Sequence, residues 1–175
     1  MIKTIAIVLV LLIAALLIYA ATKPDSFRIE RTTTIKAPPE KIFALINDFH
    51  QWEAWSPWEK IDPALKRTYS GAASGTGAIY EWNGNKDIGQ GRMEITESAP
   101  PSKVALKLDF VKPFEAHNMV EFTLATQGDS TTVTQAMYGP SPYISKLMTT
   151  FFSMEKMVGS KYEEGLANLK ALAEK

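Results

Sequence analysis

Alternating apolar and polar residues dominate the middle of the chain and predict a β-sheet. Between residues 104 and 111, Val104, Leu106, Leu108 and Phe110 alternate with polar or small residues. A period of two is typical of a strand with one buried face. The same reasoning predicts strands over 27–36, 65–71, 77–83, 88–98, 120–125 and 131–138. From residue 65 onward, short turns rich in Gly, Pro or Asn separate these strands, which favours an antiparallel sheet.

Two other segments have the period of a helix. After Pro38 and Pro39, Ile42, Phe43 and Ile46 recur at helical spacing, and a second short helix is expected over 50–55. Pro57 disfavours a helical backbone at Ser56, so this second helix should end there. From residue 144 to 174 apolar residues recur every three or four positions and predict one long amphipathic helix. These are Leu147, Phe151, Met154, Val158, Tyr162, Leu166, Leu169 and Leu172.

The order of these elements predicts an α+β fold. One strand is followed by two short helices, about six antiparallel strands and the long helix. The apolar stripe of a long helix must be buried against a sheet face, and a curved sheet wrapped around the helix is the simplest solution. Such an arrangement often leaves a cavity between the helix and the sheet. Gly159 and Gly165 weaken the helix, which is plausible where the helix and the sheet approach closely.

The N-terminal segment has no period and no charge. Residues 5–21 are 17 uncharged, mostly apolar residues (21 − 5 + 1), or roughly 25 Å of helix at about 1.5 Å per residue, the short end of what spans a bilayer. A cleaved signal peptide is the alternative, but Tyr19 occupies the place where its cleavage site needs a small residue. We therefore expect a transmembrane anchor over 1–22, a linker over 23–26 and one domain over 27–175.

Charge gives an orientation and excludes some partners. Lys3 and the terminal amine precede the apolar run, whereas Lys23 is followed by Asp25, which favours a cytoplasmic N-terminus. The domain would then lie on the extracytoplasmic side of the inner or cell membrane. With 19 basic and 19 acidic residues the chain does not predict a nucleic-acid partner. With no cysteine it has no disulfide or cysteine metal site, and nothing in it indicates a cofactor.

Several stretches carry a resemblance to a known family. They are IKAPPEKIFALINDFHQWEAWSPWEK, GAIYEWNGN, GQGRMEITES and VGSKYEEGLANLKALAE. They resemble the SRPBCC superfamily, with the START/Bet v 1-like helix-grip fold, and within it the bacterial group called polyketide cyclase/dehydrase-like. Members of that group often have one N-terminal hydrophobic segment. The resemblance covers 27–175 and implies a seven-stranded antiparallel sheet around the C-terminal helix, with a hydrophobic ligand cavity between them. It supplies no shared set of catalytic residues.

The stretch QWEAWSPWEK holds three tryptophans within seven positions, namely Trp52, Trp55 and Trp58. In the helix-grip fold the two short helices close one end of the sheet. We expect the indoles to pack there, with each N–H bonded to a backbone carbonyl or water and the charged residues between them in solvent. The alternative is that the indoles line a ligand site.

Ten residues are candidates for the wall of the cavity. Tyr80 and Trp82 share one face of a strand, where ligand contact and core packing are equally plausible. Methionine adapts to irregular ligands, although core packing is again the alternative. Gln135 lies where the family often has a large aromatic, which suggests a roomier cavity or a hydrogen-bonding group within it. The full set is Trp55, Trp58, Tyr80, Trp82, Phe110, Phe122, Gln135, Met137, Met148 and Phe152.

A catalytic site is not evident. An enzyme needs an ionisable group aimed into the cavity, for which Asp109, His117 and Tyr138 are the candidates. His117 and Glu121 share a strand face, but one His and one Glu are too few for a catalytic zinc site. We therefore expect no metal and name no catalytic residue.

The sequence thus favours a membrane-anchored domain that binds a hydrophobic small molecule or lipid, as a carrier, in sequestration or as a sensor. A cyclase- or dehydratase-type enzyme that acts in the same cavity is the rival hypothesis. A third is an envelope protein whose cavity is filled by its own side chains.

Overall fold

The computed structural model describes residues 1–175. Its helices are α1 (Ile2–Ala21), α2 (Pro39–Asn47), α3 (Trp52–Trp55), α4 (Tyr143–Met148) and α5 (Met154–Ala173), with 3₁₀ turns η1 (Phe49–Gln51) and η2 (Pro57–Lys60). Its strands are β1 (Ser26–Ile35), β2 (Lys66–Gly71), β3 (Ala78–Asn83), β4 (Gln90–Ala99), β5 (Lys103–Lys112), β6 (Ala116–Gln127) and β7 (Ser130–Pro140).

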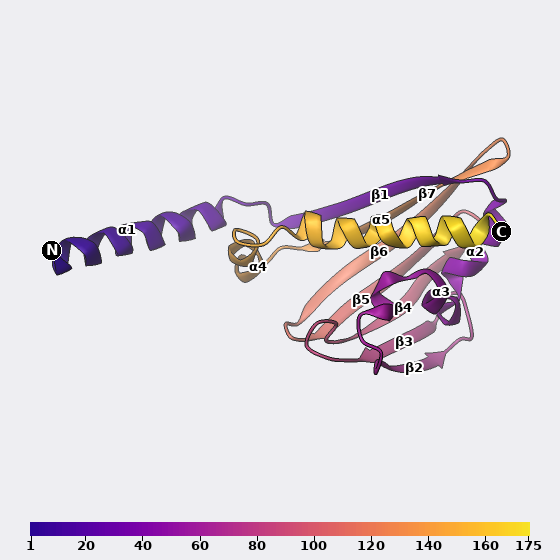
Figure 1. The fold of residues 1–175 in the computed structure, drawn as a ribbon, viewed down its shortest axis with the longest axis horizontal. Helices are drawn as coiled ribbons and strands as arrows, with labels where there is room; N and C mark the ends of the chain where they lie inside the picture. Colours follow the sequence, from indigo (N-terminus) through magenta and orange to yellow (C-terminus); the bar gives the residue numbers. More distant parts are fainter.

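The seven strands form one antiparallel sheet in the order β1-β7-β6-β5-β4-β3-β2. The first strand therefore pairs with the last, and the other strands follow one another as hairpins. The sheet wraps around α5, which lies along β1, while α2 and α3 lie beside its C-terminal half (Figure 1). The predicted α+β helix-grip fold is confirmed.

Two glycines let α5 approach its neighbours. A Cβ at Gly159 would lie 2.1 Å from the Arg31 guanidinium, and one at Gly165 would lie 3.1 Å from the Pro57 ring. Arg31 crosses α5 at that position and pairs with Glu155 and Glu163, so this ionic contact fastens β1 to the helix. The expected close approach of helix and sheet is confirmed at Gly159.

The second short helix, predicted over 50–55, is the 3₁₀ turn η1 followed by α3, and it ends at Ser56 as predicted. Pro39 occupies the first turn of α2, and the Asp48 carboxylate accepts a hydrogen bond from the backbone N–H of His50 at the start of η1. Helix α3 ends at Ser56, whose backbone is extended ahead of Pro57.

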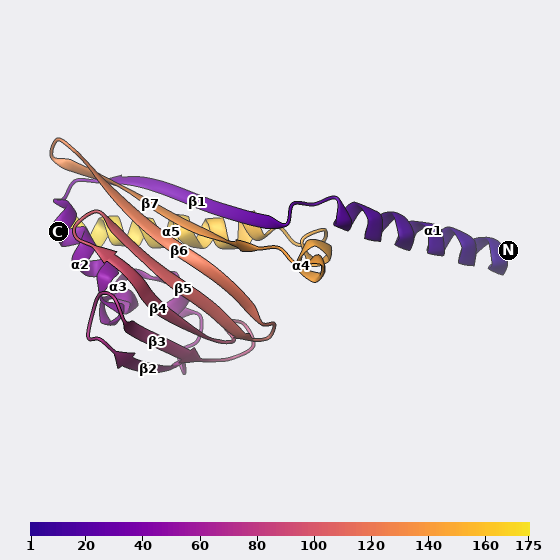
Figure 2. The ribbon, with the colours of Figure 1, turned by 180° about the vertical axis from the view of Figure 1, so that it is seen from behind.

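Helix α1 extends away from the domain at the opposite end from the C-terminus (Figures 1 and 2). Nearly all of its side chains are exposed, and Ala20 is the one that is buried. Its length and composition match those of a membrane-crossing helix, and a signal sequence has the same character.

The prediction of one helix over 144–174 is wrong at its start. The chain forms the short helix α4, turns over residues 149–153, and begins α5 only at Met154. The hydroxyls of Thr149 and Thr150 bond back to the Lys146 carbonyl, and the Ser153 side chain caps α5 by accepting from Lys156 N–H. The apolar stripe therefore continues across a break in the helix, over residues 149–153.

Candidate ligand-binding site

The inner face of the sheet is built by alternation along β6 and β7. Phe122 pairs with Gln135 and Val120 pairs with Met137 across these two strands, and all four side chains point toward α5. Val133 continues the same face of β7. Phe122, Gln135 and Met137 are each almost completely buried, whereas their contact with a ligand stays a prediction.

Gln135 is the polar exception on this apolar face. Its side chain is 5% exposed, and its amide oxygen Oε1 has no hydrogen-bond partner. The Tyr162 hydroxyl of α5 faces the Gln135 amide, and burial raises the pKa of Tyr162, so its phenol remains protonated at neutral pH. A buried acceptor without a donor costs about 1–3 kcal/mol. This site therefore holds unused hydrogen-bonding capacity in an apolar wall.

Trp52 and Trp55 close one end of the sheet. The Trp52 indole N–H donates to the Ile46 carbonyl at 2.9 Å, and that of Trp55 donates to the Leu45 carbonyl at 3.0 Å. Both rings meet Phe122 edge to face. The structure thus places Trp55 in the closure of the sheet, as expected, whereas Trp58 is only partly buried in η2.

The charged residue between the tryptophans, Glu53, is exposed as expected, but Glu59, directly after Trp58, does not face solvent. Its side chain is 5% exposed, and its two carboxylate oxygens accept from the Tyr80 hydroxyl and from Arg67 Nε, each at 2.6 Å. Burial and the neighbouring Glu59 carboxylate raise the pKa of Tyr80. Strand alternation could not reveal this role, since Glu59 lies in a 3₁₀ turn and its partners come from β2 and β3.

An aromatic row lines the inner face from β2 to β5. Tyr69, Tyr80, Trp82 and Phe110 follow one another with ring centroids 5.3, 6.1 and 5.8 Å apart. Gly91 on β4 leaves room for the Trp82 ring, since a Cβ there would lie 2.4 Å from it. Tyr80 and Trp82 are buried, while Phe110 at the end of the row is partly exposed. The row leads from the buried Glu59 to the open end of the sheet.

Two of the ten candidate residues lie away from the inner face of the sheet. Met148 ends α4, Phe152 follows it in the turn before α5, and Phe152 is 61% exposed. One continuous helix over 144–174 would turn both side chains toward the sheet, but the break between α4 and α5 turns them outward. Phe114 in the β5–β6 turn is similarly exposed, so apolar side chains also gather outside the helix-grip core.

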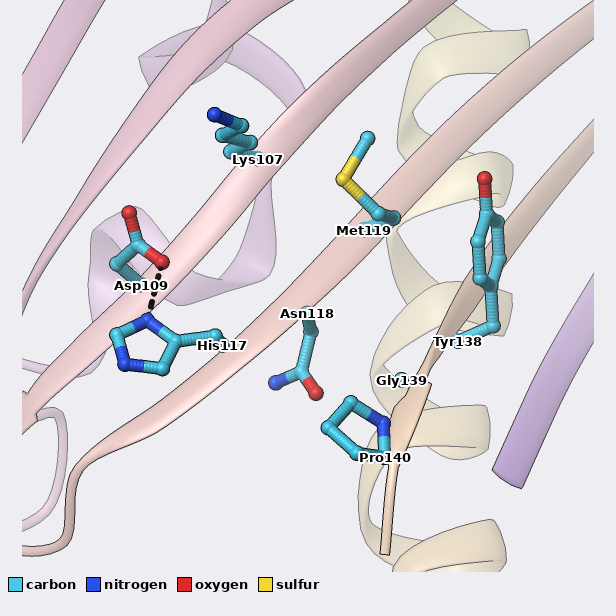
Figure 3. Close-up of a pocket in the computed structure, with 8 residues that line it drawn as sticks. All are labelled: Lys107, Asp109, His117, Asn118, Met119, Tyr138, Gly139 and Pro140. Atoms are coloured by element: carbon cyan, nitrogen blue, oxygen red, sulfur yellow. Dashed lines mark hydrogen bonds and ion pairs between the residues drawn. The ribbon is translucent and has the colours of Figure 1, made fainter. Parts of the chain in front are cut away.

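The candidates for acid–base chemistry meet on the other face of the sheet. Asp109, His117 and Tyr138 line one surface hollow of about 350 Å³, together with Lys107, Asn118, Met119, Gly139 and Pro140 (Figure 3). His117 Nδ1 lies 2.7 Å from the Asp109 carboxylate. Glu121 is not part of this pair, because it lies beside Lys103. The ionisable cluster therefore does not reach the space between the sheet and α5.

We expect His117 to titrate above its ordinary pKa of 6.5, because it is hydrogen-bonded to Asp109 and lies near Glu115. Since the raised pKa belongs to the folded state, protonation stabilises the fold below the ordinary pKa, and this contribution is lost as the pH rises through the raised value. NMR titration of the imidazole tests this. Asp109→Asn should lower the midpoint toward 6.5, and an unchanged midpoint would contradict the assignment.

Comparison with known proteins is consistent with this architecture. The family model described as "Polyketide cyclase / dehydrase and lipid transport" matches residues 26–174. A search of the curated proteins finds no match.

Among solved structures, the fold is similar to the di-domain ARO/CYC protein BexL of the BE-7585A biosynthetic pathway, with a TM-score of 0.62 and 12% identity over 90% of this chain and 53% of that one. Major latex-like protein 151 of Panax ginseng matches with a TM-score of 0.60 and 13% identity over 86% and 99% of the two chains. The Aha1 dimer of Colwellia psychrerythraea matches with a TM-score of 0.57 and 19% identity over 85% and 96%. At these identities the similarity establishes the fold alone.

Proposed function

Because the chain belongs to the polyketide cyclase/dehydrase and lipid-transport family, we propose that it binds a hydrophobic small molecule or lipid between the sheet and α5. We further propose that α1 anchors the domain to a membrane. Binding of this kind suits a carrier, a sequestering protein or a sensor.

The observation that carries the proposal is the Gln135 amide oxygen Oε1, which has no hydrogen-bond donor although the amide faces the Tyr162 hydroxyl. It is the acceptor that a ligand with one hydroxyl, amide or protonated carboxyl group would satisfy, next to a Tyr162 hydroxyl that stays protonated. The rest of the ligand would contact Phe110, Met154 and Val158, which are partly buried at the edge of the core. Burial of apolar ligand area is worth about 25 cal/mol per Å², before the costs of ordering.

The site lies beside the N-terminal half of α5, away from the short helices. Trp55 and Phe122 fill the other half with their own side chains. A ligand would enter from the end where Phe110 is partly exposed and would reach Gln135 at its inner end.

Contacts between α1 and the domain support an anchor that is retained rather than cleaved. The Tyr143 hydroxyl donates to the Leu17 carbonyl in α1, and Ala20 is fully buried. Removal of a signal peptide would delete these contacts. With Lys3 on the cytoplasmic side, the domain lies outside the inner or cell membrane.

Substitution of Gln135 tests the proposal. In Gln135→Leu we expect the affinity of the full chain for a fluorescent fatty acid to fall about 2- to 13-fold, because one hydrogen bond is worth about 0.5–1.5 kcal/mol. The variant removes the unpaired amide oxygen but also the amide that the buried Tyr162 hydroxyl faces, so the affinities are compared under conditions in which the variant is folded.

The matched control is Thr134→Val on the other face of β7. Thr134 makes an exposed hydrogen bond with Thr32 and does not face α5. The affinity of the Thr134→Val variant for the fluorescent fatty acid should therefore equal that of the wild type. Equal affinities for Gln135→Leu and Thr134→Val would contradict the proposed site.

An enzyme of the cyclase or dehydratase type is the alternative, and the family description favours keeping it. Such an enzyme needs a proton acceptor in the same space. Tyr80 and Tyr162 have raised pKa values, so both are hydrogen-bond donors rather than bases at neutral pH. The buried Glu59 carboxylate already accepts from Tyr80 and Arg67. This chemistry suits recognition of a ligand better than proton abstraction.

A further inference from the structure

Exposed apolar side chains concentrate in one short segment of the domain, from α4 to the first turn of α5. Ile144, Phe151, Phe152 and Met157 are each at least 60% exposed. With Tyr143 and Met148 they form what we call the apolar foot (Tyr143, Ile144, Met148, Phe151, Phe152 and Met157). Soluble proteins rarely leave such a concentration uncovered, and it commonly marks a site of contact with a partner or a membrane.

The foot is fastened to the end of α1. The Tyr143 hydroxyl donates to the Leu17 carbonyl at 3.0 Å, and Lys23 Nζ donates to the Thr149 hydroxyl at 3.2 Å. Lys146 forms an ion pair with Asp25, which lowers the pKa of that carboxyl. Both views place α4 at the end of the domain from which α1 leaves (Figures 1 and 2).

This position sets the depth of the foot if α1 crosses a bilayer. Leu17 precedes the last helical residue, Ala21, by four positions (21 − 17), which is about 6 Å along the helix axis. Helices that lie in the membrane interface bury their apolar face about 5–10 Å into the boundary between headgroups and acyl chains. Tyrosine is also enriched at this level. The foot therefore lies at the depth of the headgroups rather than in water.

We propose that the apolar foot inserts into the headgroup region of the same bilayer that α1 crosses. The partner is the lipid surface itself, and the N-terminal end of α5 is thereby seated against it. The inference rests on the membrane attachment of the proposed function but not on the binding of a ligand.

Depth-dependent quenching tests this in the full chain. The chain has no cysteine, so single-cysteine variants can be labelled cleanly with an environment-sensitive fluorophore. Phe152→Cys and Ile144→Cys report on the foot, and Gln127→Cys reports on an exposed site at the β6–β7 turn at the other end of the domain. Val10→Cys reports on the middle of α1. All four labelled positions are exposed on the protein, so folding is preserved.

The variants are reconstituted in nanodiscs of phosphatidylcholine and phosphatidylglycerol that carry shallow or deep spin-labelled lipids. We expect the shallow quencher to reduce the emission at Phe152→Cys and Ile144→Cys on the order of twofold more than at Gln127→Cys, because the foot lies about 5–10 Å within the interface. The deep quencher should act mainly on Val10→Cys.

Each other outcome overturns the inference. Quenching at Val10→Cys without quenching in the foot would support the anchor but contradict insertion of the foot. The foot would then be a contact surface for another partner, such as a second copy of the chain. No quenching at Val10→Cys would contradict both the membrane insertion of α1 and that of the apolar foot. Neither outcome depends on the affinity for a fatty acid at Gln135. A failure of the proposed ligand binding is therefore distinguishable from a failure of the membrane contact.

Discussion

Trp55→Ala should lower the free energy of unfolding by about 3–5 kcal/mol, the range observed when a buried aromatic is truncated in a core. The Trp55 ring is 1% exposed and packs against Trp52 and Phe122, with centroids 5.0 and 6.1 Å away. Its backbone carbonyl also accepts a hydrogen bond from the Asn168 side chain of α5. Truncation would therefore open a cavity where the short helices, the sheet and α5 meet.

Urea titration of the full chain in a mild detergent, followed by the far-ultraviolet circular dichroism of the sheet, measures this loss. Trp58→Ala is the matched control, because Trp58 is only partly buried in η2. We expect Trp58→Ala to lower the free energy of unfolding clearly less than Trp55→Ala does. If both variants unfold at the same urea concentration, Trp55 does not close the sheet as described.

Glu59→Ala should destabilise the fold by about 3 kcal/mol, near the lower end of the range for removal of one partner from a buried ion pair. The variant leaves the Tyr80 hydroxyl and the Arg67 guanidinium without the carboxylate that each contacts at 2.6 Å. The lower end applies because the Arg67 side chain is 23% exposed and can recover some hydration.

Glu53→Ala provides the control on the same guanidinium. Its carboxylate lies 4.0 Å from Arg67 and is 69% exposed, so its removal should cost less than about 1 kcal/mol. Glu59→Gln should be intermediate, since it keeps an acceptor for Tyr80 but loses the charge. Equal unfolding midpoints for Glu59→Ala and Glu53→Ala would show that the buried network does not stabilise the domain.

Local patterns were enough to predict the sheet. Alternation at Val104, Leu106 and Leu108 depends only on which face is buried, and these side chains are indeed inside. The end of the second short helix at Ser56 is equally local, because proline acts on the residue before it.

The parts that were missed depend on partners distant in sequence. The apolar stripe from Leu147 to Phe151 has helical spacing, yet the chain turns there and α4 packs beside α1. Glu59 reads as a solvent residue because its partners, Arg67 and Tyr80, lie on strands that no local pattern connects to it. Periodicity reports which face is covered, but it does not identify what covers it.

The position of the acid–base candidates shows the same limit. Asp109, His117 and Tyr138 line the same hollow, but only Asp109 and His117 are in contact with each other. Their strand parity places them on the outer face, opposite Leu108 and Met137, so they are separated from the proposed ligand by the sheet. On the inner face, Gln135 of β7 instead meets the Tyr162 hydroxyl of α5.

The central claim, that a hydrophobic ligand occupies the space between the sheet and α5, is tested most directly by photo-crosslinking. The full chain in nanodiscs is irradiated with a photoreactive fatty acid, and the modified peptides are located by tandem mass spectrometry. We predict modification within β7 around Gln135 and in the N-terminal half of α5, and less modification there in Gln135→Leu. Modification confined to α1 and the apolar foot would contradict the claim. It would indicate an anchored protein whose helix-grip core is filled by its own side chains, with Trp55 and Phe122 at its centre.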